Sequence, residues 1–160
     1  MLMDPVVDDL LVYKMGAERF FLVINASNID KDVAWITEQA KAFDVVVENQ
    51  SEKYGEVAVQ GPKTEEIVER VLGIPCKELL FYTCKELEYN GETIIISRTG
   101  YTGEDGFEIY ASHEVINQMW DTLLAAGVVP CGLGCRDTLR FEAGLPLYGH
   151  ELSDEITPLE

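Results

Sequence analysis

The chain has 160 residues and a formal net charge of −17 at pH 7, because 29 Asp and Glu residues oppose only 12 Lys and Arg. Such a surface repels nucleic-acid backbones and anionic membranes, and no apolar run approaches the roughly 18 residues that a membrane span needs. With 47% hydrophobic residues and no recognisable signal peptide, we expect a soluble, folded, cytoplasmic protein with neither nucleic acid nor a membrane among its partners.

The first third of the chain is predicted to form a hairpin, a helix and two further strands. Apolar residues 6–14 and 19–24 flank a turn, which is typical of two paired strands. Residues 44–48 and 56–60 are the further strands. Ser27 is expected to cap the helix, whose apolar residues recur at spacings of four and three: Ile29, Val33, Ile36, Ala40 and Phe43.

Downstream, capping and turn residues bound three helices and three strands. Asn90-Gly91 is the strongest short hairpin signal in the chain and predicts that the strands on either side of it pair. Ser112 has the position of a helix cap, and glycines end the helices. The predicted elements are a helix from residue 61 to 73, strands at 86–89, 93–98 and 107–110, a helix at 112–127 and a short helix ending at 144.

Strand, helix and strand follow one another twice, over residues 20–47 and 107–129. Hairpins mixed with crossover helices are typical of an α+β fold. We therefore expect mostly antiparallel sheets with crossover helices on one face, organised as two ferredoxin-like halves.

The four cysteines, Cys76, Cys84, Cys131 and Cys135, include no C-x-x-C pair. A zinc site built from Cys131, Cys135 and His150 is rejected, because its spacing matches no usual ligand pattern. Without a secretory signal, reduced and mostly buried thiols are expected, and no metal site is predicted.

Residues 98–108 hold three glycines at intervals of three and end in Glu108. They lead into a strand rather than a helix, so a dinucleotide fingerprint is excluded, and a glycine-rich hairpin connection is the simplest interpretation. The alternative is a ligand site. A carboxylate beside a rigid loop can accept two parallel hydrogen bonds from an amide–amine edge, such as that of a pterin or guanine.

Arg136 and Arg140 are four residues apart, so they share one face of the short helix. In one interpretation they neutralise acidic neighbours such as Asp137 and Glu142. In the other they clamp an anion or carboxylate near the helix N-terminus. Spacing alone does not choose between the two.

Asp8 and Asp9 interrupt the first apolar strand. Asp disfavours strands, and burying a carboxylate is costly unless it is hydrogen-bonded. Strand alternation points one of the two carboxylates inward or into a cleft, which makes the pair a candidate functional site.

Together these motifs resemble the T-protein family of the glycine cleavage system, the aminomethyltransferases, from about residue 6 to 158. Related folate-binding domains occur in dimethylglycine and sarcosine dehydrogenases. The motifs stand in the family's order: Val7-Asp8-Asp9-Leu10, Val59-Gln60-Gly61-Pro62, Ser97 to Glu108, Gly132 to Arg140, and Leu147-Tyr148-Gly149.

The resemblance implies a tetrahydrofolate-dependent transfer. Family members are considerably longer, so residues 1–160 would be a central fragment of the folate-binding region, without the family's N-terminal strands and C-terminal barrel. The family moves the methylene of an aminomethyl group, carried on the lipoyl arm of H-protein, to tetrahydrofolate. The products are 5,10-methylenetetrahydrofolate, ammonia and dihydrolipoyl H-protein, and the isolated fragment is expected to be nearly inactive.

The resemblance also implies roles for individual residues. Asp9 would be the catalytic carboxylate near the reacting folate nitrogens, and Asp8 is the alternative candidate for this role. Glu108 would hydrogen-bond the pterin edge, Tyr101 would pack in the folate cleft, and Arg136 would bond within the same site. Arg98 and Arg140 are further candidates to attract the anionic folate tail towards an acidic chain.

Two other functions remain open from the sequence. The first is a folate-binding module that catalyses nothing by itself, or the folate domain of a related dimethylglycine- or sarcosine-type enzyme. The second is a piece that docks H-protein. Folate binding separates the first alternative from the second, and turnover separates both from an aminomethyltransferase.

Overall fold

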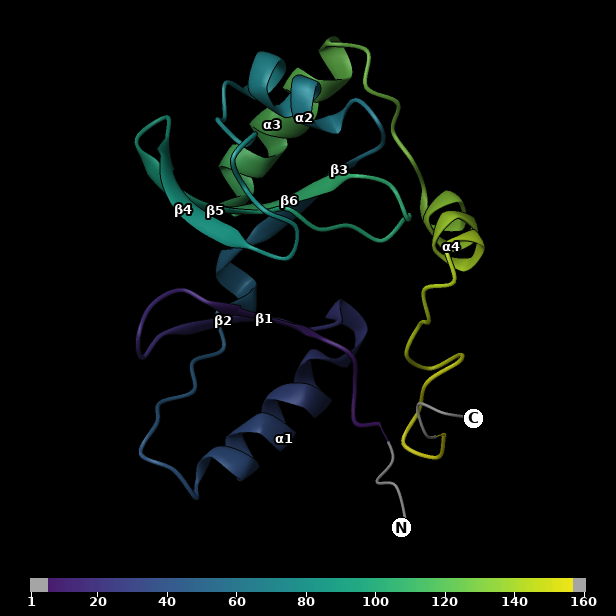
Figure 1. Cartoon of the computed structure of the whole chain (residues 1–160). Helices are drawn as coiled ribbons and strands as arrows, with labels where there is room; N and C mark the ends of the chain where they lie inside the picture. Colours follow the sequence, from purple (N-terminus) through teal and green to yellow (C-terminus); the bar gives the residue numbers. More distant parts are fainter. Residues whose placement is uncertain (1–5, 157–160) are drawn as a thin grey trace. The chain divides into compact units, whose positions relative to one another are not determined.

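The computed structural model describes residues 6–156, which divide into two compact units (Figure 1). The hairpin unit comprises residues 6–51 and 146–156, and the sheet unit comprises residues 52–145. No helix among the described residues is long and apolar enough to cross a membrane.

The hairpin unit begins with two short antiparallel strands, β1 (Leu11–Lys14) and β2 (Phe20–Val23), and their pairing confirms the predicted hairpin. A 3-10 turn, η1 (Ala26–Asn28), then leads into helix α1 (Ile29–Ala40). The expected strand over residues 6–14 is shorter than predicted, because residues 6–10 are irregular. The prediction that Ser27 caps the helix is wrong, since Asn28 is the N-cap residue and its side chain makes no capping bond.

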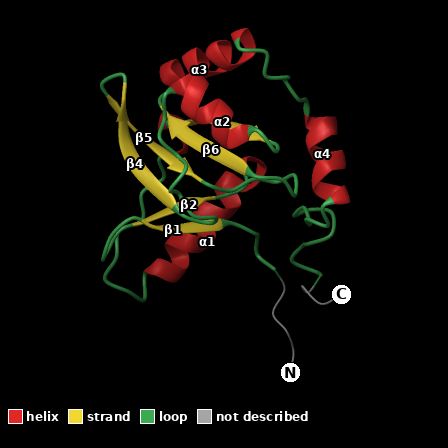
Figure 2. Ribbon diagram, turned by 45° about the horizontal axis from the view of Figure 1, so that its top comes forward, coloured by secondary structure: helices red, strands yellow, loops and turns green. Residues whose placement is uncertain are grey.

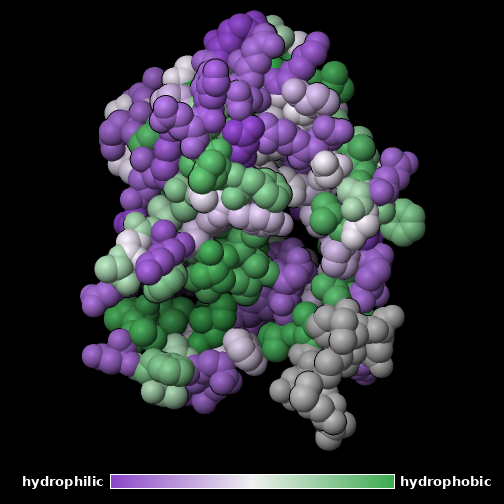
Figure 3. Space-filling view, viewed as in Figure 1, coloured by the Kyte–Doolittle hydropathy of each residue, from purple (hydrophilic) through white to green (hydrophobic). Residues whose placement is uncertain are grey.

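The predicted strand over residues 44–48 is also wrong, because these residues have no regular structure. Val45, Val46 and Val47 favour strands intrinsically, yet a strand forms only where a neighbouring strand supplies its hydrogen bonds. All three are exposed, and Figure 3 shows apolar side chains gathered on the hairpin unit.

The sheet unit contains four strands in the order β3-β6-β5-β4 (Figure 1), and every neighbouring pair is antiparallel. Asn90 and Gly91 turn β4 into β5 with φ angles of 51° and 85°, as the predicted hairpin requires. The strands are β3 (Gly55–Gln60), β4 (Cys84–Tyr89), β5 (Glu92–Ser97) and β6 (Gly106–Ala111).

Helices accompany this sheet at the predicted places. The first, α2 (Thr64–Ile67), continues as a π-helical turn, η3 (Val68–Leu72), and ends at Gly73. The others are α3 (His113–Ala125) and α4 (Leu133–Glu142), and a 3-10 turn, η2 (Ser51–Lys53), precedes β3.

The core of the sheet unit lies between one face of the sheet and the helices α2 and α3 (Figure 2). Because side chains alternate along a strand, Phe107 and Ile109 of β6 enter this core, while Glu108 and Tyr110 lie on the opposite face. The sheet therefore separates an apolar face that holds the fold together from a face that carries polar side chains.

The α+β class and the antiparallel pairing are confirmed, whereas the strand–helix–strand repeats are not. Among residues 6–156, the strands expected directly after α1, at 44–48, and directly after α3, at 128–129, do not form, so two ferredoxin-like halves are not completed as expected. The short apolar runs at 44–48 and 128–129 lack a pairing strand there.

The cap of α3 yields a stability prediction. Ser112 Oγ accepts a hydrogen bond from Val115 N, and Glu92 accepts from both the amide and the hydroxyl of Ser112. Ser112→Ala should lower the free energy of unfolding by about 0.5–2 kcal/mol. Urea unfolding followed by the fluorescence of Trp120 measures this change. Ser27→Ala is the matched control and should change stability little, so equal losses would contradict the assignment.

Candidate functional site

Glu108 is a fixed, mostly buried carboxylate on the sheet face opposite the helices. Its exposed fraction is 8%, and Tyr110 donates its hydroxyl to Glu108 Oε2 at 2.8 Å. The strand register sets Ala58 beside Glu108 and Glu56 beside Tyr110. The predicted carboxylate thus lies where strand alternation allows it to meet a ligand rather than the core.

The glycine-rich connection before β6 holds Tyr101 in place. The amide of Tyr101 donates to Gln60 Oε1 at 2.8 Å, and the amide of Gly61 donates to the carbonyl oxygen of Asp105 at 2.8 Å. Gly103 has a φ of 77°, and a Cβ added to it would lie 2.8 Å from the Cβ of Ala143. Any side chain at this position would be strained and would clash, so the loop needs glycine there.

Arg136 lies at the start of α4, with its guanidinium 4.5 Å from the ring centroid of Tyr101. Its side chain is exposed, and no carboxylate among residues 6–156 forms an ion pair with it. A planar cation stacked on an aromatic ring is held in orientation while its N–H groups stay open to a ligand. The structure thus brings together Tyr101 and Arg136.

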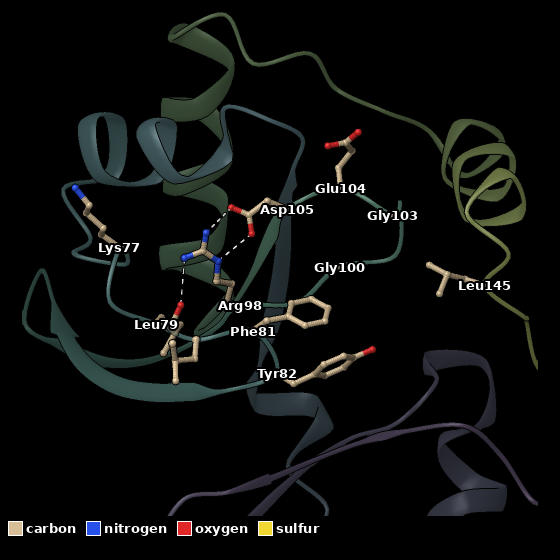
Figure 4. A pocket seen from close by; sticks show the side chains of 11 residues that line it. Lys77, Leu79, Phe81, Tyr82, Arg98, Gly100, Gly103, Glu104, Asp105 and Leu145 are labelled. Atoms are coloured by element: carbon tan, nitrogen blue, oxygen red, sulfur yellow. Dashed lines mark hydrogen bonds and ion pairs between the residues drawn. The ribbon is translucent and has the colours of Figure 1, made fainter.

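Arg98 does not fit the expected role of attracting an anion. It forms a bidentate pair with Asp105, through Nε–Oδ1 at 2.9 Å and Nη2–Oδ2 at 2.7 Å, and a third contact to Glu65 at 2.9 Å. Figure 4 shows these Asp105 bonds beside a hollow of about 570 Å³, where Arg98 also donates to the carbonyl oxygen of Leu79. Arg98 is therefore already neutralised by two carboxylates.

Arg140 is likewise used within the fold. It is 4% exposed, pairs with Asp137 at 2.8 Å and donates to the carbonyl oxygen of Leu145 at 3.1 Å. The interpretation of a neutralising cation therefore holds for Arg140, whereas Arg136, one turn earlier in α4, is exposed and forms no ion pair among residues 6–156.

Two carboxyls of the sheet unit have raised pKa values. Burial and then the charge of Glu108 raise the pKa of Glu56 from 4.5 to about 7, and Arg136 opposes the shift. Burial also raises the pKa of Glu108, against the hydroxyl of Tyr110 and the charge of Arg136. Because folded Glu56 takes up a proton that the unfolded chain lacks, its contribution to stability falls as the pH rises from 4.5 to 7. No sequence pattern singled out Glu56, since only the register reveals its neighbours.

Asp8 and Asp9 lie in the irregular segment before β1, so the expected strand alternation does not apply to them. The side chain of Asp8 is 2% exposed, and its oxygens accept from Asn25 at 2.7 Å and Asn28 at 2.6 Å. Asp9 is exposed, and its Oδ1 accepts a longer bond of 3.2 Å from Asn25. Asp8 is therefore committed to the fold, while Asp9 faces solvent.

The sequence reasoning missed the residues that hold these two carboxylates. Asn25 precedes the turn η1, Asn28 ends it and Asp32 lies in the first turn of α1, so only the folded turn brings the three together and no single helical periodicity marks them.

The four cysteines are free thiols. The expectation that they are mostly buried fails for Cys131 and Cys135, which are exposed.

Comparison with known proteins identifies several relatives. The chain matches the GCVT N-terminal domain family over residues 4–160. It is 52% identical to an aminomethyltransferase of Alkaliphilus oremlandii and 49% identical to one of Lysinibacillus sphaericus, over 97% of this chain and 44% of each relative. A crystal structure of glycine cleavage system aminomethyltransferase T from Bartonella henselae is similar, with a TM-score of 0.87 and 35% identity over 97% of this chain and 42% of that one. The chain thus spans less than half the length of these relatives.

The electrostatics of the sheet unit give a prediction that requires no ligand. Arg136→Gln should raise the pKa of both Glu56 and Glu108 further, because each loses a cation that lowers it. A ¹³C NMR titration of the glutamate carboxyl carbons measures both values. Arg70→Gln, which removes an exposed cation paired with Glu66, is the control and should leave both unchanged. If the pKa values of Glu56 and Glu108 are unchanged in Arg136→Gln, Arg136 does not lie near these two carboxyls and the prediction is refuted.

Proposed function

The chain belongs to the GCVT N-terminal domain family, and we propose that it supplies the folate-binding portion of an aminomethyltransferase of the glycine cleavage system. Its similarity over 97% of the chain to relatives of that name supports the proposal. Residues 1–160 would act as a central portion of a longer enzyme, in keeping with the 44% of each relative that they span.

The proposed reaction moves one carbon between two carriers. N5 of tetrahydrofolate attacks the methylene of an aminomethyl group bound to the lipoyl sulfur of H-protein, and ammonia leaves. The methylene then bridges N5 and N10, and dihydrolipoyl H-protein is released. The partners are therefore tetrahydrofolate as co-substrate and lipoylated H-protein, and the proposed compartment is the cytoplasm.

In this proposal, Asp9 has a catalytic role and Glu108 has a binding role. Asp9 would orient the reacting nitrogens and stabilise the positive charge that develops as N5 attacks. Asp9 is exposed, and among residues 6–156 its carboxylate accepts one long bond, from Asn25, which leaves it open to a substrate, in contrast to Asp8. Asp9 is accordingly the proposed catalytic residue.

The sheet unit would bind the folate itself. Glu108 would accept two hydrogen bonds from the amide–amine edge of the pterin, and the charge of Arg136 favours the ionised form that this requires. Tyr101 would pack against the ligand, while the guanidinium stacked on its ring would bind an anionic or carbonyl group. The observation that carries the proposal is this pairing of Tyr101 with Arg136, an exposed arginine without a carboxylate partner among residues 6–156.

Turnover by a hybrid enzyme tests the proposal. In the hybrid, this chain replaces the matched segment of the Alkaliphilus oremlandii aminomethyltransferase, to which it is 52% identical. With lipoylated H-protein, the hybrid should form methylenetetrahydrofolate. Asp9→Asn should lower kcat about 100-fold or more, because general acid–base and charge stabilisation are lost, and should change the KM for folate little.

The controls separate catalysis from binding and folding. Asp30→Asn changes an exposed carboxylate on α1 and should leave kcat unaltered. A loss in Asp9→Asn confined to the KM for folate would count against the catalytic role. A hybrid that folds and binds H-protein but forms no methylenetetrahydrofolate would refute the proposed function.

A further inference from the structure

The turn before α1 and the first turn of α1 contact the segment that carries the two aspartates. Asn25 and Asn28 donate from their side-chain amides, Lys31 donates to the carbonyl oxygen of Val7, and Asp32 lies one turn beyond Asn28. These bonds take the place of strand pairing for residues 7–9, which have no regular structure of their own. The conformation of that segment therefore depends on side chains of the turn and of the start of α1.

Asp8 is the centre of this arrangement. Its Oδ1 accepts from the amide of Asp9 at 2.8 Å and from Asn25 at 2.7 Å, and its Oδ2 accepts from Asn28 at 2.6 Å. Lys31 Nζ lies 3.5 Å from the same Oδ2. A carboxylate with this many donors is stable as the anion although its side chain is 2% exposed.

Asp32, unlike Asp8, is a buried carboxyl that lacks hydrogen-bond donors other than Lys31 among the described residues. Its side chain is also 2% exposed, and Lys31 Nζ lies 2.9 Å from Oδ1. Apart from this ion pair, no N–H or O–H group among residues 6–156 donates to either oxygen of Asp32. Two buried carboxylates would thus share one ammonium group, and the second charge would lack the donors it needs.

A proton on Asp32 resolves this deficit, because it removes one charge and creates a donor. Asp8 Oδ2 and Asp32 Oδ1 lie 3.5 and 2.9 Å from the same Lys31 Nζ and both side chains are buried, so a proton on one carboxyl has the other carboxyl as its nearby acceptor. Asp8 is already supplied with donors, so the proton belongs on Asp32. The ammonium of Lys31 then balances the single remaining anion, and it also lies 4.2 Å from the ring centroid of Tyr148.

The amide of Asn25 connects the pair to Asp9. Its Nδ2 lies 2.7 Å from Asp8 Oδ1, 3.2 Å from the carbonyl oxygen of Asp9 and 3.2 Å from Asp9 Oδ1. The backbone amide of Asp9 is bonded to the same oxygen of Asp8. A displacement of the Asp8 carboxylate would therefore move both the backbone and the side chain of Asp9.

We propose that Asp32 is a positioning residue: its protonated carboxyl donates to ionised Asp8, which with Asn25 fixes the carboxylate of Asp9 for reaction. The positioning role rests on the proposed function of Asp9, whereas the shared proton does not. Asp32 itself touches neither substrate.

The titration behaviour of the two carboxyls is consistent with this division. Burial raises the pKa of Asp32, and Asp8 raises it further against the ammonium of Lys31. Burial would also raise the pKa of Asp8, but the hydrogen bonds from Asp32, Asn25 and Asn28 outweigh it and lower the value. Among the described residues, the charged and titratable groups beside the pair are Lys31 of α1, with Tyr148 of the C-terminal segment against its ammonium, and the neighbouring Asp9.

A carboxyl ¹³C NMR titration of the 160-residue chain tests the shared proton without any substrate. The carboxyl carbon of Asp32 should titrate above 3.8, the ordinary value for Asp, and that of Asp8 below it. If the carboxyl carbon of Asp32 titrates at or below 3.8, the proton is not shared and the proposal fails.

Kinetics of the hybrid enzyme test the positioning role. Asp32→Ala should lower kcat about 10–100-fold, because a displaced catalytic group loses alignment, while the KM for folate changes little. Asp32→Asn keeps an N–H donor towards Asp8 and should restore kcat to within about threefold of the parent. Asp8→Asn replaces an accepting oxygen with an N–H group that faces other N–H donors, such as those of Asn25 and Asn28. This variant should reduce kcat at least as much as Asp32→Ala.

The reference variant is Asp9→Asn. If Asp9→Asn lowers kcat and Asp32→Ala does not, the positioning role is refuted while the proposed function stands. If Asp9→Asn leaves kcat unchanged, the catalytic role of Asp9 fails and takes the positioning role with it, and the titration still decides the shared proton. Should Asp32→Ala not fold, Asp32→Asn and Asp8→Asn carry the test: equal losses in both would overturn the proposal, since only Asp32 is expected to tolerate the amide.

Discussion

Few cations are available in this chain to balance its carboxylates. With 29 acidic residues against 12 Lys and Arg, several of the cations among the described residues are bonded to nearby carboxylates. Arg98 holds Asp105 and Glu65, Arg140 holds Asp137, and Lys31 lies between Asp8 and Asp32. Buried carboxylates without a cation need hydrogen-bond donors or a proton, and both solutions occur here.

The small number of cations also bears on which charged side chains stay exposed. Among residues 6–156, Arg136 stacks on Tyr101 and forms no ion pair with a carboxylate, so its guanidinium keeps hydrogen-bonding capacity. In the hairpin unit, Asp8 accepts hydrogen bonds from Asn25 and Asn28, and Asp9 next to it stays exposed. In both places, one charged residue, Arg140 or Asp8, is bonded within the fold while a nearby residue of the same charge is exposed.

Local patterns predicted the elements that depend on local physics. Turn and cap signals such as Asn90-Gly91 and Ser112 were confirmed, because their bonds lie within a few residues of sequence. The strand at 44–48 was wrong, since a pairing partner, not Val propensity, decides strand formation. Spacing also could not distinguish Arg136 from Arg98 and Arg140, because the distinction rests on contacts with Asp105, Glu65 and Asp137. The roles of Asp9, Glu108, Tyr101 and Arg136 stay predictions.

The most direct measurement is the calorimetric affinity of the hybrid enzyme for tetrahydrofolate, with Arg136→Gln compared with Arg140→Gln. The account predicts that Arg136→Gln weakens binding about tenfold or more, because a charged hydrogen bond is lost, at nearly unchanged stability. Arg140→Gln should instead lower stability, because it leaves the carbonyl oxygen of Leu145 and the carboxylate of Asp137 without their donor. Unaltered folate affinity in Arg136→Gln would contradict the claim that the one stacked arginine without a carboxylate partner among residues 6–156 is kept for the ligand.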